Sequence, residues 1–250
     1  MRKVKKALDS ADLFTVRSQC PPVTTFQYAG SELEIFEKAH NWKGYLRRSM
    51  EPYLTGSVLE VGAGLGANTR QFAALHFDRW TCLEPDQSLL QQIEPADRRE
   101  LIAGDLSALD SAARFDAILY VDVLEHIADD SAELRRAAAH LNPGGALIVL
   151  SPAHPWLFTP FDKAIGHYRR YTRQSLQAAA PPHLRREKLI YLDSVGMLAS
   201  LANRLLLNQS MPTAAQVRTW DTCLVPCSCW IDPLFLGAVG KSVLGVWRNV

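Results

Sequence analysis

Three glycines and two acidic residues are the clearest candidates for ligand binding in the sequence. In the segment VLEVGAGLGANT an apolar stretch runs into Gly62, Gly64 and Gly66, which can form a tight turn that a ligand approaches closely. Glu84 ends the next apolar stretch, where a carboxylate can accept both hydroxyls of a ribose. Asp105 ends the third, where a carboxylate can accept from an exocyclic amine. Each feature alone could be a plain turn or helix cap, but together they predict a cofactor site at one edge of a sheet.

A second group of chemical side chains lies in IGHYRRYT, residues 165–172. The stretch follows neither the period of a strand nor that of a helix. A guanidinium binds carboxylate or phosphate through two parallel hydrogen bonds, so Arg169 or Arg170 could hold an anionic acceptor. Alternatively, the stretch closes a loop, with the arginines solvated and Thr172 as the N-cap of a helix over RQSLQAAA. Both interpretations stay open at this point.

Apolar stretches alternate with helix-like stretches along the chain. We expect strands over 57–64, 80–86, 100–106, within 115–127, and over 144–152, 186–194 and 241–249. We expect helices from Ser31 to about Pro52, over 67–75 and 88–93, and over 129–141 with Asp130 and Glu133 at the spacing of a capping box. This alternation implies a parallel sheet covered on both faces.

Composition limits the classes of protein that fit. The 250 residues are 48% hydrophobic and 21% charged, with a formal net charge of +1, which suits one globular domain and gives no electrostatic case for nucleic acid as a partner. We expect no secretory signal and no transmembrane segment, and five cysteines without a disulfide framework favour a cytoplasmic location. The cysteines at 223–229 lack a matching histidine pair, so no metal site is predicted.

The motifs resemble those of class I S-adenosylmethionine-dependent methyltransferases. VLEVGAGLG is similar to the first motif of that family, CLEPD to the second, AGDL to the third, FDAILYVDVLEHI to the fourth, and LNPGGALIV to the turn into the fifth strand. The resemblance covers about residues 50–155. It implies an α/β fold with a doubly wound, Rossmann-like, seven-stranded sheet, mostly parallel with an antiparallel last strand. It also implies an arm and α-helical lid over 1–48 and one methyltransferase domain over 49–250, divided into a donor-binding half (49–155) and an acceptor-side half (156–250).

The resemblance assigns residues to a donor, S-adenosyl-L-methionine. Glu84 would hold the ribose hydroxyls, and Asp105 would face the adenine amine. Glu60 should be structural, because its side chain belongs to a strand that is apolar on both sides of it. The other implied donor-binding residues are Gly62, Ala63, Gly64 and Gly66 along the methionine and ribose, Pro85 and Asp86 beside the adenine, Leu106 against its ring, and Val121 and Asp122 near the amino-acid end.

The resemblance places the acceptor beyond the fourth and fifth strands. The pattern D-x4-GH-x-RR-Y-T-x3-L, from Asp162 to Leu176, is similar to one in small-molecule and cell-surface-glycan methyltransferases. A general base is needed only if the acceptor is protonated at the working pH. The LEHI segment recurs across the family whatever the acceptor, which favours a structural or donor-side role for its histidine. The catalytic candidates are His154, His167 and Tyr168, and the substrate-binding candidates are Tyr28, His126, Arg169, Arg170 and Tyr171.

A nicotinamide-dependent oxidoreductase is the main rival, because Gly62, Gly64 and Ala67 satisfy its G-x-G-x-x-G/A fingerprint, with an acid about 20 residues further on. The acid of the third strand and the LNPGG turn favour the methyl donor. We therefore expect a methyltransferase for a small-molecule or glycan- or lipid-linked acceptor, with oxygen as the favoured atom and an apolar acceptor pocket over 195–236. A catalytically silent donor-binding partner subunit is the alternative of a third class, and a homodimer is compatible with the sequence.

Overall fold

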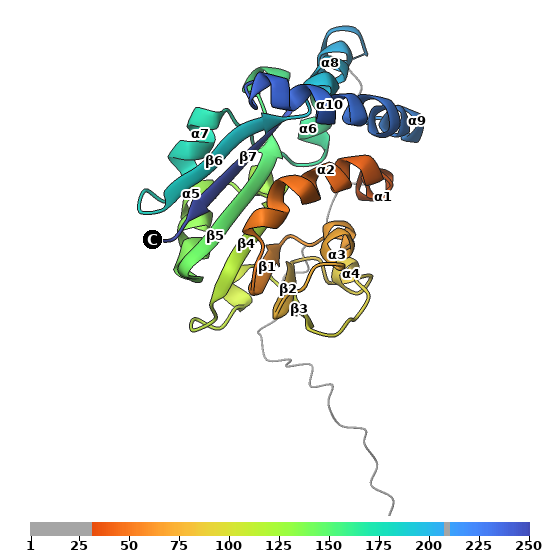
Figure 1. Ribbon diagram of the computed structural model, residues 1–250. Coiled ribbons are helices and arrows are strands. Elements are labelled where there is room, and N and C mark those ends of the chain that lie inside the picture. Colours follow the sequence, from red (N-terminus) through yellow and green to blue (C-terminus); the bar gives the residue numbers. More distant parts are fainter. Residues whose placement is uncertain (1–31, 208–210) are drawn as a thin grey trace, which may run out of the picture.

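A seven-stranded sheet forms the centre of the molecule (Figure 1). The computed structural model describes residues 32–207 and 211–250. The strands are β1 (Ser57–Val61), β2 (Arg79–Glu84), β3 (Arg99–Ala103), β4 (Phe115–Val121), β5 (Leu141–Pro152), β6 (Arg185–Leu192) and β7 (Ser242–Arg248). Their order is β3-β2-β1-β4-β5-β7-β6, with parallel pairing from β3 to β5 and β7 antiparallel to both β5 and β6. The expected mostly parallel sheet with an antiparallel last strand is confirmed.

The strands are apolar along most of their length because both faces of the sheet are covered. In β1, Val58 packs into one core and Leu59 into the core on the opposite face. β4 continues the alternation, with Leu119 in the first core and Ile118 in the second. Each fully buried side chain of this kind stabilises the fold by about 1.5–3 kcal/mol. Since side chains alternate along a strand, the two cores together fix the register of the central strands.

Helices cover both faces and the end of the sheet where β5 and β6 finish (Figure 1). The α-helices are α1 (Glu32–Glu37), α2 (His40–Met50), α3 (Ala67–Phe72), α4 (Gln87–Leu90), α5 (Asp130–Ala139), α6 (Pro160–Ala164), α7 (Arg173–Ala179), α8 (Ser194–Ala202), α9 (Ala214–Thr219) and α10 (Val225–Ile231). The 3₁₀ segments are η1 (Glu51–Tyr53), η2 (Leu106–Ala108), η3 (Leu124–His126), η4 (Pro155–Leu157) and η7 (Asp232–Phe235). Two π-helical segments are η5 (Asn203–Leu207) and η6 (Trp220–Leu224). No helix in the described ranges is long and apolar enough to cross a bilayer.

The expected N-terminal helix is divided into α1 and α2. Trp42, Leu46 and Met50 of α2 are buried in the core on one face of the sheet, so this helix is part of the packed body. The arm that was expected ahead of it lies largely outside the described residues. The boundary expected at residue 48 falls inside α2, which continues to Met50, and the division of the chain into 1–48 and 49–250 stays a prediction.

Two helix N-caps were predicted, and one of the predictions is wrong. Asp129 caps α5 by accepting a hydrogen bond from the backbone N–H of Ala132 at 2.9 Å. Asp130 therefore does not form the expected capping box and accepts instead from the hydroxyl of Tyr171 at 2.7 Å. Thr172 caps α7 as expected, in a reciprocal capping box with Ser175.

Replacing Thr172 with alanine should lower the free energy of unfolding by about 0.5–2 kcal/mol, because the first turn of α7 loses its side-chain acceptor. Urea denaturation followed by circular dichroism measures this loss. Thr222→Ala is the matched control, since that exposed hydroxyl donates to the carbonyl of Arg218 and caps no helix; its effect should stay within about 0.5 kcal/mol. Equal losses in both variants would contradict the role of the cap.

Candidate active site

The glycine loop between β1 and α3 has the backbone conformation that the sequence predicts. Gly62, Gly64 and Gly66 have positive φ angles of 67°, 54° and 71°, which side chains other than hydrogen rarely tolerate. A Cβ atom on Gly62 would lie 2.6 Å from the side chain of Val123, so that position is also closed sterically. Among the described residues, the only side chain within 4 Å of a Cβ on Gly64 would be that of Leu33, at 3.9 Å. The backbone at Gly64 is therefore open to a ligand, whereas Gly62 is fixed by packing.

Glu84 joins the end of β2 to the glycine loop. Its carboxylate is buried and accepts hydrogen bonds from the backbone N–H of Gly64 at 2.8 Å and of Asp86 at 2.9 Å. Burial raises the pKa of Glu84, and these two N–H groups oppose that rise. Each carboxylate oxygen retains a lone pair, so the group can still accept the two hydroxyls of a ribose. The sequence predicted the position of this acid but not its bond to the loop.

The other predicted donor residues follow β2 and β3. Asp105 caps η2, with one oxygen accepting from the backbone N–H (2.8 Å) and the hydroxyl (2.6 Å) of Ser107. The Ser107 hydroxyl is the main reason that the pKa of Asp105 is lowered, so the side chain is an ionised acceptor. Asp86 is buried and caps α4. Leu106 is buried in the core, and Pro85 is half-buried. Their contacts with an adenine stay predictions.

Glu60 has the structural role that the sequence indicated. Its carboxylate is buried and accepts from the hydroxyl of Thr69 at 2.5 Å and from the indole N–H of Trp80 at 2.9 Å. These bonds tie β1 to α3 and β2. Burial raises the pKa of Glu60 to about 7, against the effect of both donors.

The stability of the chain should fall as pH rises from about 5 to about 7, with a slope of up to about 1.4 kcal/mol per pH unit. The pKa of Glu60 rises from 4.5 to about 7 on folding, so in this window the folded chain holds a proton that the unfolded chain has released. Glu60→Gln should flatten the slope in urea titrations at several pH values. Glu100→Gln, on the half-exposed side of β3, should leave it unchanged. An unaltered slope in Glu60→Gln would contradict this assignment.

Asp122 follows β4, where the resemblance places the amino-acid end of the donor. Its side chain is solvent-accessible and its φ angle is 54°. Surrounding protein atoms nevertheless desolvate the carboxylate and raise its pKa, while the nearby charges of His167, Lys241 and Lys43 lower it. Asp122 is thus an accessible acid with cationic side chains nearby. This environment suits a ligand with both an ammonium and a carboxylate group, because charges of both signs face it.

The two arginines of residues 165–172 are already paired with carboxylates of the chain. Arg170 binds both oxygens of the fully buried Asp162, at 2.7 and 2.9 Å. Although burial alone would raise the pKa of Asp162, His167 and Arg170 hold it at about 2. Arg169 pairs with Asp130 at 2.6 Å. These contacts favour the structural interpretation of both arginines, and a role for either in holding the acceptor stays a prediction.

The remaining acceptor-side candidates differ in how accessible they are. Tyr171 is buried, and its hydroxyl donates to Asp130. Tyr168 is 61% exposed, with its ring beside the guanidinium of Arg169. His154 has a φ angle of 64°, places Nε2 3.0 Å from the carbonyl oxygen of Gly240, and packs against Tyr191. Tyr28 lies outside the described residues. The catalytic and substrate-binding roles of these side chains stay predictions.

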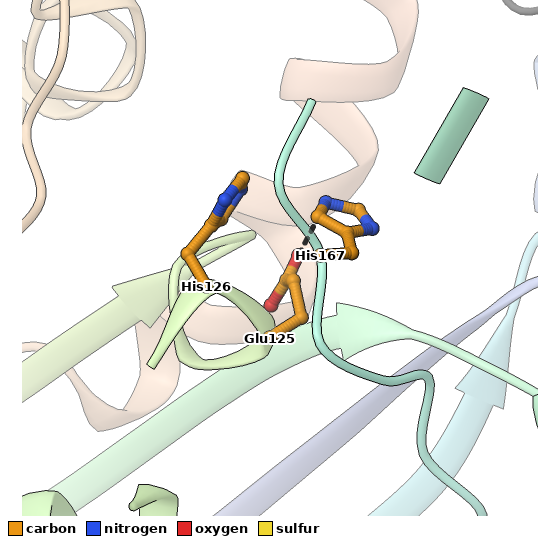
Figure 2. A group of neighbouring side chains, drawn as sticks. All are labelled: Glu125, His126 and His167. Atoms are coloured by element: carbon orange, nitrogen blue, oxygen red, sulfur yellow. Dashed lines mark ion pairs between the residues drawn. The ribbon is translucent and has the colours of Figure 1, made fainter. Parts of the chain in front are cut away.

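Two of the predicted residues, His126 and His167, lie together with Glu125, which the sequence did not single out (Figure 2). The substrate-binding role of His126 and the catalytic role of His167 stay predictions. Glu125 and His126 lie in η3, immediately after β4, and His167 comes from the loop that follows α6. The two imidazole rings meet edge to face at 4.6 Å between centroids. Burial and then the charge of Asp122 raise the pKa of Glu125, whereas burial lowers the pKa of His126 to about 4. The only sequence signal for this group was the presence of histidine in both LEHI and IGHYRRYT.

Two cavities of about 550 and 340 Å³ lie away from these strand ends. The larger is lined by α7 and β6, including Arg173 and Lys188. The smaller lies between α2 and α10, beside Gly44 and Trp230. Neither of the two is lined by a predicted site residue, so the candidate site is defined by the side chains at the strand ends and not by cavity size.

The fold and the donor edge together define a class of enzyme. The strand order, the antiparallel β7, and a glycine loop bonded to the acid at the end of β2 are the features that the resemblance to class I methyltransferases implied. Comparison with known proteins agrees, since the model of a family described as methyltransferase domain matches residues 35–203. The chain belongs to this family, in the S-adenosylmethionine-dependent class. The oxidoreductase alternative is not supported.

Curated relatives are named as methyltransferases, and solved structures share the fold. The chain is 33% identical over 155 residues to a demethylmenaquinone methyltransferase of Tropheryma whipplei, covering 59% of this chain and 61% of that protein. It is 30% identical over 113 residues to a ubiquinone biosynthesis O-methyltransferase of Azorhizobium caulinodans, covering 42% and 44%. The N-methyltransferase NodS of Bradyrhizobium japonicum, crystallised with S-adenosyl-l-homocysteine, has the same fold with a TM-score of 0.55 at 16% identity, covering 89% of this chain and 93% of NodS. The chain thus spans less than two thirds of the curated relatives that it matches.

Proposed function

We propose that this protein transfers the methyl group of S-adenosylmethionine to an oxygen atom of a small molecule with a large apolar part. The observation that carries the donor half of this proposal is the bond between Gly64 and Glu84. Because of this bond, the backbone of Gly64, which has space beside it, and the carboxylate of Glu84, which keeps lone pairs for further bonds, lie side by side at the carboxyl edge of the sheet. S-adenosylmethionine, when bound, supplies an electrophilic methyl group on a sulfonium.

The chain has to bind and align the two reactants. Orientation of this kind can lower a barrier by about 7–11 kcal/mol without any proton transfer. The glycine loop and Glu84 would fix the nucleoside, and Asp122 with the neighbouring cations would fix the amino-acid end. The acceptor would then lie beyond β4 and β5, between η3 and the segment from α8 to η7.

Exposed apolar side chains support an acceptor with an apolar part. Six large ones belong to or directly follow the elements from α8 to η7: Leu198, Leu205, Trp230, Leu234, Phe235 and Leu236. They are six of the nine large hydrophobic side chains that are exposed among the described residues, so this part of the chain offers most of the exposed apolar surface to a ligand. The proteins named for menaquinone and ubiquinone above are relatives of the chain, and this favours a hydroxylated quinone precursor with an apolar tail over a glycan.

Turnover with three acceptors tests this proposal. They are a hydroxyquinone with an isoprenoid tail, the same head group without the tail, and a glycan. With a deuterated methyl donor, mass spectrometry should find the label on oxygen, with the highest kcat/KM for the tailed acceptor. Preference for the glycan, or a label on nitrogen or carbon, would contradict the proposal. Binding of S-adenosylhomocysteine without turnover of any acceptor would favour the silent partner subunit.

A further inference from the structure

The carboxylate of Glu125 is buried and has no hydrogen-bond partner among the described residues. The side chain has no exposed surface, and neither of its oxygens accepts a hydrogen bond within the described residues. A buried polar group without a partner costs about 1–3 kcal/mol, and more when it is charged. A carboxyl group that persists in such a place needs a cation or a proton beside it.

Two histidine nitrogens lie beside this carboxylate. One ring nitrogen each of His126 and His167 and one oxygen of Glu125 lie within 4.8 Å of one another (Figure 2). Nε2 of His167 is 3.8 Å from the Glu125 oxygen, which is too long for a hydrogen bond. Two ligands of one zinc ion, each about 2.0–2.1 Å from the metal, lie at most about 4.2 Å apart. The His167–Glu125 pair therefore already meets this limit, and the whole group of three lies within 4.8 Å.

The tautomer of His167 leaves the correct nitrogen available. Its Nδ1 lies 2.9 Å from the carboxylate of Asp162. This carboxylate also accepts hydrogen bonds from Arg170 and from the backbone N–H of Thr159. Nδ1 therefore donates its hydrogen, and in a neutral ring Nε2 presents its lone pair toward Glu125. A histidine whose second nitrogen is held by a carboxylate is the usual arrangement of a metal ligand, because the carboxylate fixes both the ring and the tautomer.

We propose that Glu125, His126 and His167 bind a divalent transition-metal cation, with Zn²⁺ as the ion to test first. Two imidazoles and one carboxylate form the donor set of open zinc sites, in which three protein ligands leave a coordination position for a small molecule. Asp122 precedes η3 and is a solvent-accessible acid close enough to Glu125 to raise its pKa. Resting on the proposed function, we infer that the open position takes the acceptor hydroxyl. The cation would lower the pKa of this hydroxyl, so that its proton passes to solvent water and the oxygen attacks the methyl group as an anion.

Metal content and titration test the site in the full chain. After removal of metal by a chelator, calorimetry with Zn²⁺ and visible absorption with Co²⁺ should each give one equivalent. Glu125→Gln and His167→Gln should abolish this binding, and Asp162→Asn should weaken it about 10–100-fold through loss of the bond to His167. His183→Gln is the control, because this histidine is exposed and lies outside the group. Circular dichroism establishes that each variant is folded.

Two results would overturn the metal site. One is the absence of Zn²⁺ or Co²⁺ binding by the folded wild-type chain. The other is equal binding by wild type and the folded Glu125→Gln and His167→Gln variants. Calorimetry with S-adenosylhomocysteine on the same samples separates these outcomes from failure of the proposed function. The ligand variants should retain donor affinity, so loss of metal with intact donor binding concerns this site alone.

Discussion

Replacing Glu84 with alanine should weaken binding of the methyl donor by about 100-fold or more. Each hydrogen bond to a charged group contributes about 1.5–3 kcal/mol, and the carboxylate would supply two to the ribose. The substitution also removes the acceptor for the backbone N–H groups of Gly64 and Asp86, so the glycine loop loses the group that holds it. Calorimetric titration with S-adenosylhomocysteine measures the change in Kd.

Two matched variants make this result specific. Glu100→Ala removes a half-exposed carboxylate from the neighbouring strand β3 and should leave donor affinity unchanged. Glu84→Gln retains one acceptor oxygen and should fall between wild type and Glu84→Ala. Donor affinity in Glu84→Ala within about threefold of wild type, less than one hydrogen bond is worth, would place the ribose elsewhere.

Replacing Arg170 with alanine should lower the free energy of unfolding by about 3–5 kcal/mol. The substitution removes the guanidinium from a fully buried carboxylate and leaves Asp162 with an uncompensated charge. Urea denaturation at neutral pH measures the loss. The bonds from His167 and Thr159 to Asp162 remain in the variant, but they do not replace the two parallel bonds from the guanidinium.

Arg169→Ala is the internal comparison for this prediction. Arg169 pairs with Asp130 near the surface, where both side chains retain solvent contact, so its removal should cost about 1 kcal/mol or less. Equal stability of the two arginine variants, with a raised KM for the acceptor in Arg170→Ala alone, would support the anion-binding interpretation instead. The structure favours a large difference in stability between the two variants, because Arg170 neutralises a fully buried acid and Arg169 does not.

The donor edge could be predicted from the sequence because its signals are local. A glycine needed for a positive φ angle follows directly after an apolar strand, and the acids at the ends of the next two strands meet the same edge of a parallel sheet. Gly64 and Glu84 are 20 residues apart, yet the order of neighbouring strands brings them together. The seven strands were each recognisable for the same reason, since an apolar run bounded by turn residues needs no distant information.

The acceptor side could not be predicted in the same way. Asp162 was only one end of a sequence pattern, and nothing local showed that it would hold both Arg170 and His167. Asp130 was predicted as a helix cap, but the adjacent Asp129 caps the helix and Asp130 meets Tyr171. The Asp130–Tyr171 pair joins residues 41 positions apart, and the two Asp162 pairs lie within one irregular loop, 5 and 8 residues apart. No periodic pattern constrains the partner in either case.

Calorimetric titration of the full chain with S-adenosylhomocysteine and, separately, with NAD is the most direct test that this chain holds a methyl donor at the glycine loop. We expect the wild-type chain to bind one equivalent of S-adenosylhomocysteine and no NAD. The affinity for S-adenosylhomocysteine should be markedly weaker in Glu84→Ala. Binding of NAD without binding of S-adenosylhomocysteine would contradict this expectation.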